Sequence, residues 1–484
     1  MAGIMIQGTA SSAGKSLLVT ALCRIFSNDG LKVAPFKSQN MSLNSYVTLE
    51  GLEMGRAQVL QAQAARIEPS VLMNPILLKP TTNRKSQVII KGRPYRNMDA
   101  AAYFAFKPQL REMIRTIYRE LESQHDVVVL EGAGSPAEIN LQENDIVNMG
   151  MAAMAKAPVL LAADIDKGGV FASIYGTVML LPEHERAMMK GVVINKFRGD
   201  VSLLKAGLDR IEALTGIPVI GVIPYITDLQ LDEEDSAIDF NRKSRGAIDI
   251  CVITLPRISN FTDFDAFRSD EDVTVRYVSD PSEIQGADMV VIPGSKNTIG
   301  DLRWLKQAGF AEALQNFDGI IFGLCGGYQM LGQRIVDEDG WEMRAGEAEE
   351  GLGLFQTTTI FTGSKVTSNV SGSAGCAKIS GYEIHSGKST GNANPFVTIE
   401  HKDGHSVNER DGDVVEDRIY GTYIHGIFDS GEFRSVLLNR IRRKKGLPEQ
   451  AARGLDQQRE LELERLARTV RKHLDLERVY SLLE

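Results

Sequence analysis

Near its amino terminus the chain reads Gly8-Thr9-Ala10-Ser11-Ser12-Ala13-Gly14-Lys15-Ser16. An apolar run, residues 4–6, precedes this stretch, and a helical pattern, residues 17–26, follows it. Small residues let backbone N–H groups approach a phosphate, and the start of a helix adds a positive dipole. Lys15 can reach terminal phosphates and Ser16 can ligate magnesium. The stretch therefore predicts a strand, a phosphate-binding loop and a helix.

The spacing of this loop is unusual. Counted from Gly8 it is one residue longer than Gly-x-x-x-x-Gly-Lys-Ser, so the strict pattern starts at Thr9. In this respect the chain resembles the dethiobiotin-synthetase-like branch of nucleotide-binding proteins. We expect Gly8, Thr9, Gly14, Lys15 and Ser16 to bind the phosphates of ATP. The alternative is a small-residue turn without a ligand.

Short apolar runs alternate with helical patterns along the first half of the chain. The runs are residues 4–6, 33–36, 127–130, 159–162, 191–194 and 219–223, with helices predicted at residues 16–26 and 109–121. Such alternation is typical of an open parallel sheet covered by helices, an α/β fold.

A length of 484 residues favours two domains. The pattern becomes charged at residues 228–246, which predicts a linker, and strands are predicted again at residues 248–254, 289–293 and 319–323. We therefore expect an α/β domain at residues 1–240 and a second open parallel-sheet domain at residues 247–440. Residues 441–484 are a predicted helical extension, in which Leu463, Leu466, Val470 and Leu474 recur at helical spacing. The basic cluster at residues 440–445 is expected to cap a helix.

Composition limits the possible partners. The net charge of −9 argues against a nucleic-acid partner, which would require a basic face. The first residues contain neither a charged leader nor a long apolar segment, so we expect no membrane partner and a cytoplasmic protein. Four scattered cysteines agree with a reducing compartment.

Three further residues follow predicted strands of the first domain. Glu131 lies at the carboxyl edge of the sheet between flanking glycines and is a candidate magnesium ligand with Ser16. Lys37 can neutralise a carboxylate or an acyl phosphate. Asn195 begins Asn-Lys-Phe-Arg, in which Arg198 replaces the carboxylate that would read guanine, so adenine is favoured. The alternatives are a solvated carboxylate and a plain asparagine at a strand end.

Residues 79–96 contain six cationic side chains and no acidic one. A polyanionic substrate would explain this stretch, and a solvated basic hairpin is the alternative. The six are Lys79, Arg84, Lys85, Lys91, Arg93 and Arg96.

The second domain carries Gly323-Leu324-Cys325-Gly326-Gly327 between an apolar strand and a helix. This pattern is typical of a nucleophile elbow, in which the helix start lowers the pKa of the cysteine. His425 follows another strand end and is the predicted base, so the pair can attack an amide. Residues 293–298 are predicted to offer backbone N–H groups to the oxyanion. His385 is assigned to the neighbourhood of the domain interface and not to catalysis.

Five motifs together resemble the glutamine-hydrolysing cobyric acid synthases of the cobalamin pathway, from Met1 to about Arg440. They are Phe36-Lys37-Ser38-Gln39-Asn40-Met41, Glu131-Gly132-Ala133-Gly134-Ser135-Pro136, residues 164–172, residues 195–199 and residues 323–329. The sister enzymes that form the a,c-diamide carry a Gly-Pro-Asp type of sequence where this chain has Gln39-Asn40-Met41.

The resemblance implies a class I glutamine amidotransferase-like second domain and amidation that depends on ATP, Mg²⁺ and glutamine. The implied substrate is adenosylcobyrinic acid a,c-diamide, whose four carboxylates b, d, e and g would be amidated to give adenosylcobyric acid. Other glutaminases carry Glu two positions after the histidine, where this chain has Ile427, so a Cys-His dyad is implied.

Two alternatives stay open. One is a glutamine-dependent ligase for another carboxylate, such as cobyrinic acid or a cell-wall precursor. The other is a nucleotide-switched binding protein with an inactive glutaminase. The sequence predicts no oligomeric state.

Overall fold

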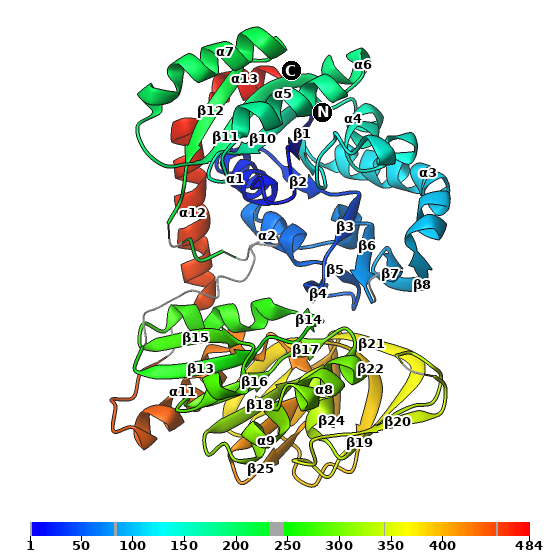
Figure 1. The fold of residues 1–484 in the computed structure, drawn as a ribbon, viewed down its shortest axis with the longest axis vertical. Helices are drawn as coiled ribbons and strands as arrows, with labels where there is room; N and C mark the ends of the chain where they lie inside the picture. The colour runs from blue at the N-terminus through cyan, green and yellow to red at the C-terminus, as the bar shows by residue number, and fades with distance from the viewer. Residues whose placement is uncertain (1, 82–84, 228, 232–245, 343, 452–453) are drawn as a thin grey trace. The chain divides into compact units, whose positions relative to one another are not determined.

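The computed structural model describes residues 2–81, 85–227, 229–231, 246–342, 344–451 and 454–484 (Figure 1). The chain divides into two compact units. The first contains Met1–Ser42, Met54–Ser236 and Arg459–Glu484, and the second contains Leu43–Glu53 and Ala237–Gln458. The predicted linker, residues 228–246, lies almost wholly outside the described residues.

The first unit is built on a six-stranded parallel sheet in the order β12-β11-β10-β1-β9-β2. Its strands are β1 (Ala2–Gly8), β2 (Val33–Phe36), β9 (Val127–Glu131), β10 (Val159–Asp164), β11 (Met189–Phe197) and β12 (Val219–Pro224). Each contains one of the predicted apolar runs, which confirms the parallel α/β fold. The runs are continuous because both faces of the sheet are covered.

Helices pack on both faces of this sheet. One buried cluster joins the sheet to α3 (Ala100–Gln124), α4 (Met149–Ala155), α5 (Val170–Leu180) and α7 (Lys205–Thr215). The other joins it to α1 (Lys15–Asn28), α2 (Arg56–Ala64), α12 (Leu455–His473) and α13 (Leu476–Ser481). The short α6 (Glu183–Arg186) precedes β11.

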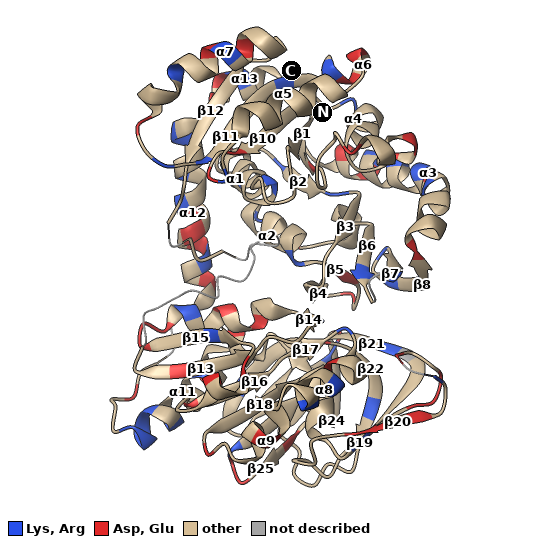
Figure 2. Cartoon of the chain, in the orientation of Figure 1, with Lys and Arg blue, Asp and Glu red and all other residues tan. Residues whose placement is uncertain are grey.

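Helix α12 belongs to the core of the first unit, whereas the sequence predicted a separate extension. Leu463, Leu466 and Val470 are buried against α1, as their spacing predicted. Arg24 of α1 is fully buried, and its guanidinium donates hydrogen bonds to Glu460 of α12 at 2.5 and 2.8 Å. Figure 2 shows both acidic and basic segments along α12. The helix therefore completes the hydrophobic layer that covers α1.

A small sheet in the order β3-β6-β7-β8 extends the first unit. Its strands are β3 (Gln39–Met41), β6 (Ile76–Pro80), β7 (Lys85–Ile90) and β8 (Arg93–Asp99). Most of the basic stretch forms the antiparallel pair β7–β8. Arg93 and Arg96 of β8 are exposed, whereas Lys79 of β6 is buried. Arg84 lies outside the described residues. A solvated hairpin and a polyanion-binding surface both agree with this arrangement.

The second unit contains a six-stranded sheet in the order β15-β13-β16-β18-β26-β25, parallel except for the pair β25–β26. Its strands are β13 (Ile248–Ile253), β15 (Val273–Val278), β16 (Met289–Ile292), β18 (Ile320–Leu324), β25 (Asp413–Val415) and β26 (Ile419–Thr422). Its helices are α8 (Thr298–Gln307), α9 (Phe310–Gln315), α10 (Gly326–Leu331) and α11 (Gly431–Lys444). Basic residues occupy the last turn of α11, which confirms the predicted cap.

A second, largely antiparallel sheet was not predicted. It follows the order β20-β19-β21-β22-β27, with β23 and β24 added at β21. The strands are β19 (Arg334–Asp337), β20 (Glu347–Glu350), β21 (Thr358–Ala374), β22 (Ala377–Thr390), β23 (Val397–Lys402), β24 (His405–Asp411) and β27 (Ile424–His425). Strands β21 and β22 form a long antiparallel pair. Strand β22 also pairs with β27, the strand that carries His425.

An early segment, residues 43–53, is part of the second unit. It contains β4 (Ser45–Val47), which pairs with β5 (Glu53–Gly55). The hydroxyl of Tyr382 in β22 donates a hydrogen bond to the Ser45 carbonyl at 2.9 Å. Glu53 is fully buried and forms an ion pair with Lys365 of β21. The segment is therefore fixed by buried polar contacts within that unit.

None of the helices among the described residues is both long and apolar enough to span a membrane.

Candidate functional site

The phosphate-binding loop joins β1 to α1, as predicted. The Thr9 amide donates a hydrogen bond to the Ala162 carbonyl of β10 at 2.9 Å, which fixes the start of the loop to the sheet. The Lys15 ammonium donates to the carbonyls of Ala10 and Ser11 at 2.8 Å and to Gly134 at 3.3 Å. Lys15 therefore lies between the loop and the segment after β9.

Gly14 has a left-handed backbone with φ of 86°. A Cβ atom at this position would lie 2.1 Å from Nδ2 of Asn195. The Asn195 amide donates to the Ala13 carbonyl at 3.1 Å and accepts from the Lys196 backbone at 2.9 Å. The side chain of Asn195 therefore holds the loop, and glycine at position 14 is a steric requirement.

Glu131 lies at the centre of a buried polar cluster at the carboxyl end of β9. One carboxylate oxygen accepts hydrogen bonds from Ser16 and Lys37, both at 2.8 Å, and the other accepts from Gln61 at 2.5 Å. Burial raises the pKa of Glu131, but the Lys37 ammonium and the hydrogen bonds from Lys37 and Gln61 outweigh it and leave this pKa below its ordinary value. Glu131 is therefore a carboxylate at neutral pH.

Ser16 and Glu131 fit a magnesium site. Adjacent ligands of an octahedral Mg²⁺ ion, each about 2.1 Å from the metal, lie about 3 Å apart. The two oxygens are separated by 2.8 Å, and both are hard donors of the type this ion prefers. The described residues contain no group of three or more His, Cys, Asp or Glu arranged to hold a metal, so phosphates and water would supply the other ligands.

A small pocket of about 80 Å³ adjoins Asn195 on the far side of the loop. Apolar side chains of α1, of β12 with the residues after it, and of α12 line it with Asn195, Lys196 and Tyr225. Arg198 stacks on the Tyr225 ring at 3.5 Å and pairs with Asp166 at 2.8 Å. This arrangement is consistent with a purine base on an apolar wall. Recognition of adenine by Asn195 stays a prediction.

Cys325 lies in the turn between β18 and α10. Its backbone adopts φ of 49° and ψ of −105°, a conformation rare for a residue with a side chain. The Cys325 amide donates to the Thr422 carbonyl at 2.8 Å. A Cβ atom at Gly327 would lie 1.9 Å from the Ile292 carbonyl oxygen, so this position of the turn requires glycine. These features match the predicted nucleophile elbow.

His425 in β27 is brought close enough to Cys325 for the cysteine to raise the pKa of its imidazole, and the Cys325 thiol donates to the Ile384 carbonyl at 3.6 Å. Its Nδ1 atom faces the Asp263 carboxylate at 2.7 Å, and the other oxygen of Asp263 accepts from the Gly426 amide at 2.9 Å. His425 and Asp263 are both almost fully buried. The dyad expected from the sequence therefore has a third member, which comes from the segment after β14 (Ile258–Ser259) and not from position 427.

The electrostatics of this cluster favour a protonated His425. Burial lowers the pKa of His425, but the Asp263 carboxylate and the Cys325 sulfur outweigh it and raise this pKa to about 10. The imidazolium form of His425 is thus stabilised next to Cys325. Such an arrangement can attack an amide carbon and protonate the departing nitrogen.

The predicted oxyanion loop lies against the elbow. A Cβ atom at Gly326 would lie 3.0 Å from the backbone nitrogen of Ser295, in β17 (Gly294–Ser295). Donation to an oxyanion stays a prediction. His385 stacks on Tyr423 with ring centroids 3.8 Å apart, and its Nδ1 atom contacts the Gly387 carbonyl at 3.0 Å. Its position at a domain interface also stays a prediction.

Sequence reasoning missed two residues of these sites. Gln61 comes from α2 and donates a hydrogen bond to Glu131, and Asp263 comes from a 3₁₀ segment, 162 positions before His425. Neither residue follows a strand in a recognisable motif. The other candidate residues lie around the loop or around the elbow, and their roles in binding and catalysis stay predictions.

A phosphate-binding loop with a buried carboxylate, together with a Cys-His-Asp site at a nucleophile elbow, defines a glutamine-dependent ligase. Family models agree. Residues 4–238 match the CobQ/CobB/MinD/ParA nucleotide binding domain, and residues 249–433 match the CobB/CobQ-like glutamine amidotransferase domain. The cobyric acid synthase of Clostridium botulinum is 53% identical, over 100% of this chain and 99% of that protein. Those of Clostridium acetobutylicum and Clostridium kluyveri are 52% and 51% identical, over 100% of this chain and 99% and 98% of theirs. The chain belongs to the cobyric acid synthase family.

Proposed function

We propose that this protein amidates the b, d, e and g carboxylates of adenosylcobyrinic acid a,c-diamide and thereby forms adenosylcobyric acid. The observation that supports this most directly is the pairing of the Glu131 cluster with the Cys325 triad in a chain of this family. Relatives named cobyric acid synthase support the choice of a corrinoid acid as the substrate. ATP and glutamine are the other two substrates.

In the first unit, an oxygen of the substrate carboxylate attacks the γ-phosphorus of ATP, and the bond to the ADP oxygen breaks. Lys15 and Lys37 neutralise the charge that gathers on the transferring group. Magnesium bound by Ser16 and Glu131 would screen the phosphates. The product is an acyl phosphate. The nitrogen of ammonia then attacks its carbonyl carbon, phosphate leaves, and an amide remains after loss of a proton.

In the second unit, the Cys325 thiolate attacks the side-chain amide carbon of glutamine. The His425 imidazolium donates its proton to the amide nitrogen, which leaves as ammonia and a thioester remains. Neutral His425 then takes a proton from water, the resulting hydroxide attacks the thioester, and glutamate and the thiol are released. Asp263 keeps the Nδ1 atom of His425 protonated, so the Nε2 atom is available for these transfers.

The experiment incubates the purified chain with ATP, glutamine, Mg²⁺ and the a,c-diamide, and follows the products by mass spectrometry. We expect four successive replacements of hydroxyl by amino groups, each with the formation of ADP and glutamate. Cobyrinic acid and a cell-wall carboxylate serve as competing substrates. Preferred amidation of either would overturn the assignment, and the absence of both glutamate release and amide product would favour a nucleotide-switched binding protein with an inactive glutaminase.

A further inference from the structure

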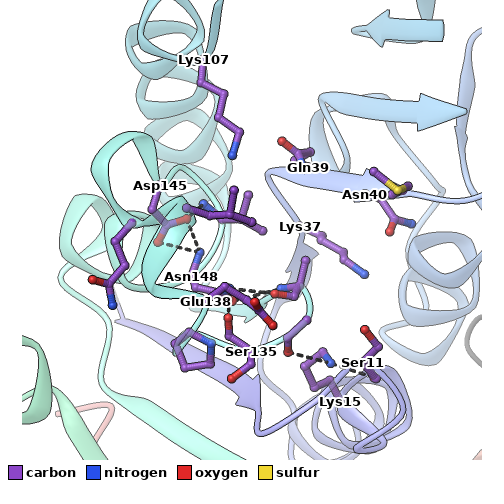
Figure 3. A pocket seen from close by; sticks show the side chains of 17 residues that line it. Ser11, Lys15, Lys37, Gln39, Asn40, Lys107, Ser135, Glu138, Asp145 and Asn148 are labelled. Atoms are coloured by element: carbon purple, nitrogen blue, oxygen red, sulfur yellow. Dashed lines mark hydrogen bonds between the residues drawn. The ribbon is translucent and has the colours of Figure 1, made fainter. Parts of the chain in front are cut away.

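A cavity of about 420 Å³ lies beside the phosphate-binding loop (Figure 3). Lys15 and Lys37 line one end of it, next to the Glu131 cluster. Lys107 of α3 lies at the opposite end, with its side chain directed into the cavity. The cavity therefore has cationic side chains at both ends. Only the end at the loop takes part in the proposed phosphoryl transfer.

Lys107 is an unusual lysine. It is only 9% exposed, and its ammonium makes no hydrogen bond or ion pair with any residue that the structure describes. The nearest recorded contact is the Phe104 ring, with its centroid 5.7 Å from Nζ. Burial lowers the pKa of Lys107, and the charge of Asp145 opposes this only in part. A nearly buried cation without a direct partner is costly, so an anion in the cavity would stabilise it.

The acidic residues of the cavity do not fill this role. Asp145 accepts hydrogen bonds from the backbone amides of Val147, Asn148 and Gly150, at distances between 2.8 and 3.2 Å. Its carboxylate therefore serves the turn before α4. Glu138 also lines the cavity, but no ion pair joins it to Lys107 among the described residues.

We propose that Lys107 binds a carboxylate of the acid substrate, while a second carboxylate of the same molecule reaches the γ-phosphoryl group near Lys15 and Lys37. The inference rests on the proposed function. The loop holds the anionic part of ATP at the other end, so the anion at Lys107 comes from the acid. Lysine suits a substrate amidated at several positions, because its ammonium is a compact charge on a flexible stem and accepts carboxylates from different directions.

The test compares Lys107→Ala and Lys107→Arg with the wild-type chain. Loss of one charge-assisted hydrogen bond corresponds to about 10- to 100-fold in affinity. We expect Lys107→Ala to raise the KM for the a,c-diamide by that factor, with the KM for ATP and glutamine hydrolysis unchanged. Lys107→Arg should restore most of the affinity. Arg119→Ala removes an exposed cation from the same helix and is the matched control.

Equilibrium dialysis of the a,c-diamide without ATP measures binding independently of turnover, and thermal melting reports whether each variant is folded. Unchanged KM and unchanged binding in Lys107→Ala would overturn the inference and leave the proposed function intact. An increase in the KM for ATP alone would assign Lys107 to the nucleotide and also overturn it. If the wild-type chain binds the a,c-diamide through Lys107 but forms no amide, the proposed function fails, and only the assignment of a carboxylate to Lys107 stands.

Discussion

Replacement of Asp263 with Asn is expected to impair glutamine hydrolysis specifically. Asparagine keeps the size of the side chain and can still accept the hydrogen bond from the Gly426 amide. It removes the negative charge that faces Nδ1 of His425 at 2.7 Å. The imidazolium then loses its main stabilising partner, and a smaller fraction of His425 carries the proton that the departing amide nitrogen needs.

The magnitude follows from the pKa of His425, which rises from 6.5 to about 10. At about 1.4 kcal/mol per pH unit, the difference corresponds to about 5 kcal/mol of preference for the imidazolium. Asp263 and Cys325 together raise the pKa of His425, and burial opposes them by lowering it. If half belongs to Asp263, the variant loses about 2–3 kcal/mol, which corresponds to roughly 30- to 150-fold in kcat/KM for glutamine.

The assay measures glutamate release between pH 6 and 10, together with the alkylation rate of Cys325 by iodoacetamide. Exposed Cys376 would also react, so both chains carry Cys376→Ser. Amidation with free ammonia should stay at the wild-type rate. Asp270→Asn, which breaks a buried ion pair with Arg434, is the control for lost stability alone. A wild-type pH profile and alkylation rate in Asp263→Asn would refute the role of Asp263.

Four further outcomes are expected. Cys325→Ser should abolish glutamine use and spare amidation from ammonia, measured with each nitrogen source; loss of both would disprove two separate sites. Glu131→Gln should lower ATP-dependent amidation by at least about 100-fold, because the proposed magnesium ligand is lost, with glutaminase activity unchanged. Leu466→Ala should lower the free energy of unfolding by about 2–5 kcal/mol in denaturant titrations; a smaller loss would mean that α12 contributes little packing. The pKa of His425 is raised on folding, so its stabilising effect is complete below about pH 6.5 and is lost as the pH approaches 10. The stability difference between wild type and His425→Gln should therefore shrink over this range, and a growing difference would contradict the assigned charge state.

The parallel sheets could be predicted because their strands are buried on both faces. Residues 33–36 are continuously apolar, and the strand has those bounds. The long strands β21 and β22 escaped notice because serine, threonine and glycine interrupt their apolar positions. Their pairing depends on contacts between distant segments, which local pattern does not reveal.

In the two sites as well, local sequence pattern predicted some residues and missed others. Glu131 and Cys325 could be predicted because Glu131 ends a buried strand, Cys325 directly follows one, and a glycine comes immediately after each. Asp263 could not, since it stands in a short 3₁₀ segment whose sequence has no recognisable catalytic pattern. The spacing of Leu463, Leu466 and Val470 predicted a helix but not that this helix packs on α1. Nothing in the sequence around Arg24 of α1 indicates that this side chain is buried.

The position of α12 determines when the nucleotide-binding core can close during synthesis. Helix α1 is made before residues 237–458 of the second unit, and the residues that cover it are made after them. Because α1 ends at residue 28 and α12 begins at residue 455, the apolar face of α1 waits roughly 20–85 s for its cover at about 5–20 residues per second. During that interval Arg24 lacks Glu460, and a growing chain exposes the surface that a chaperone would bind.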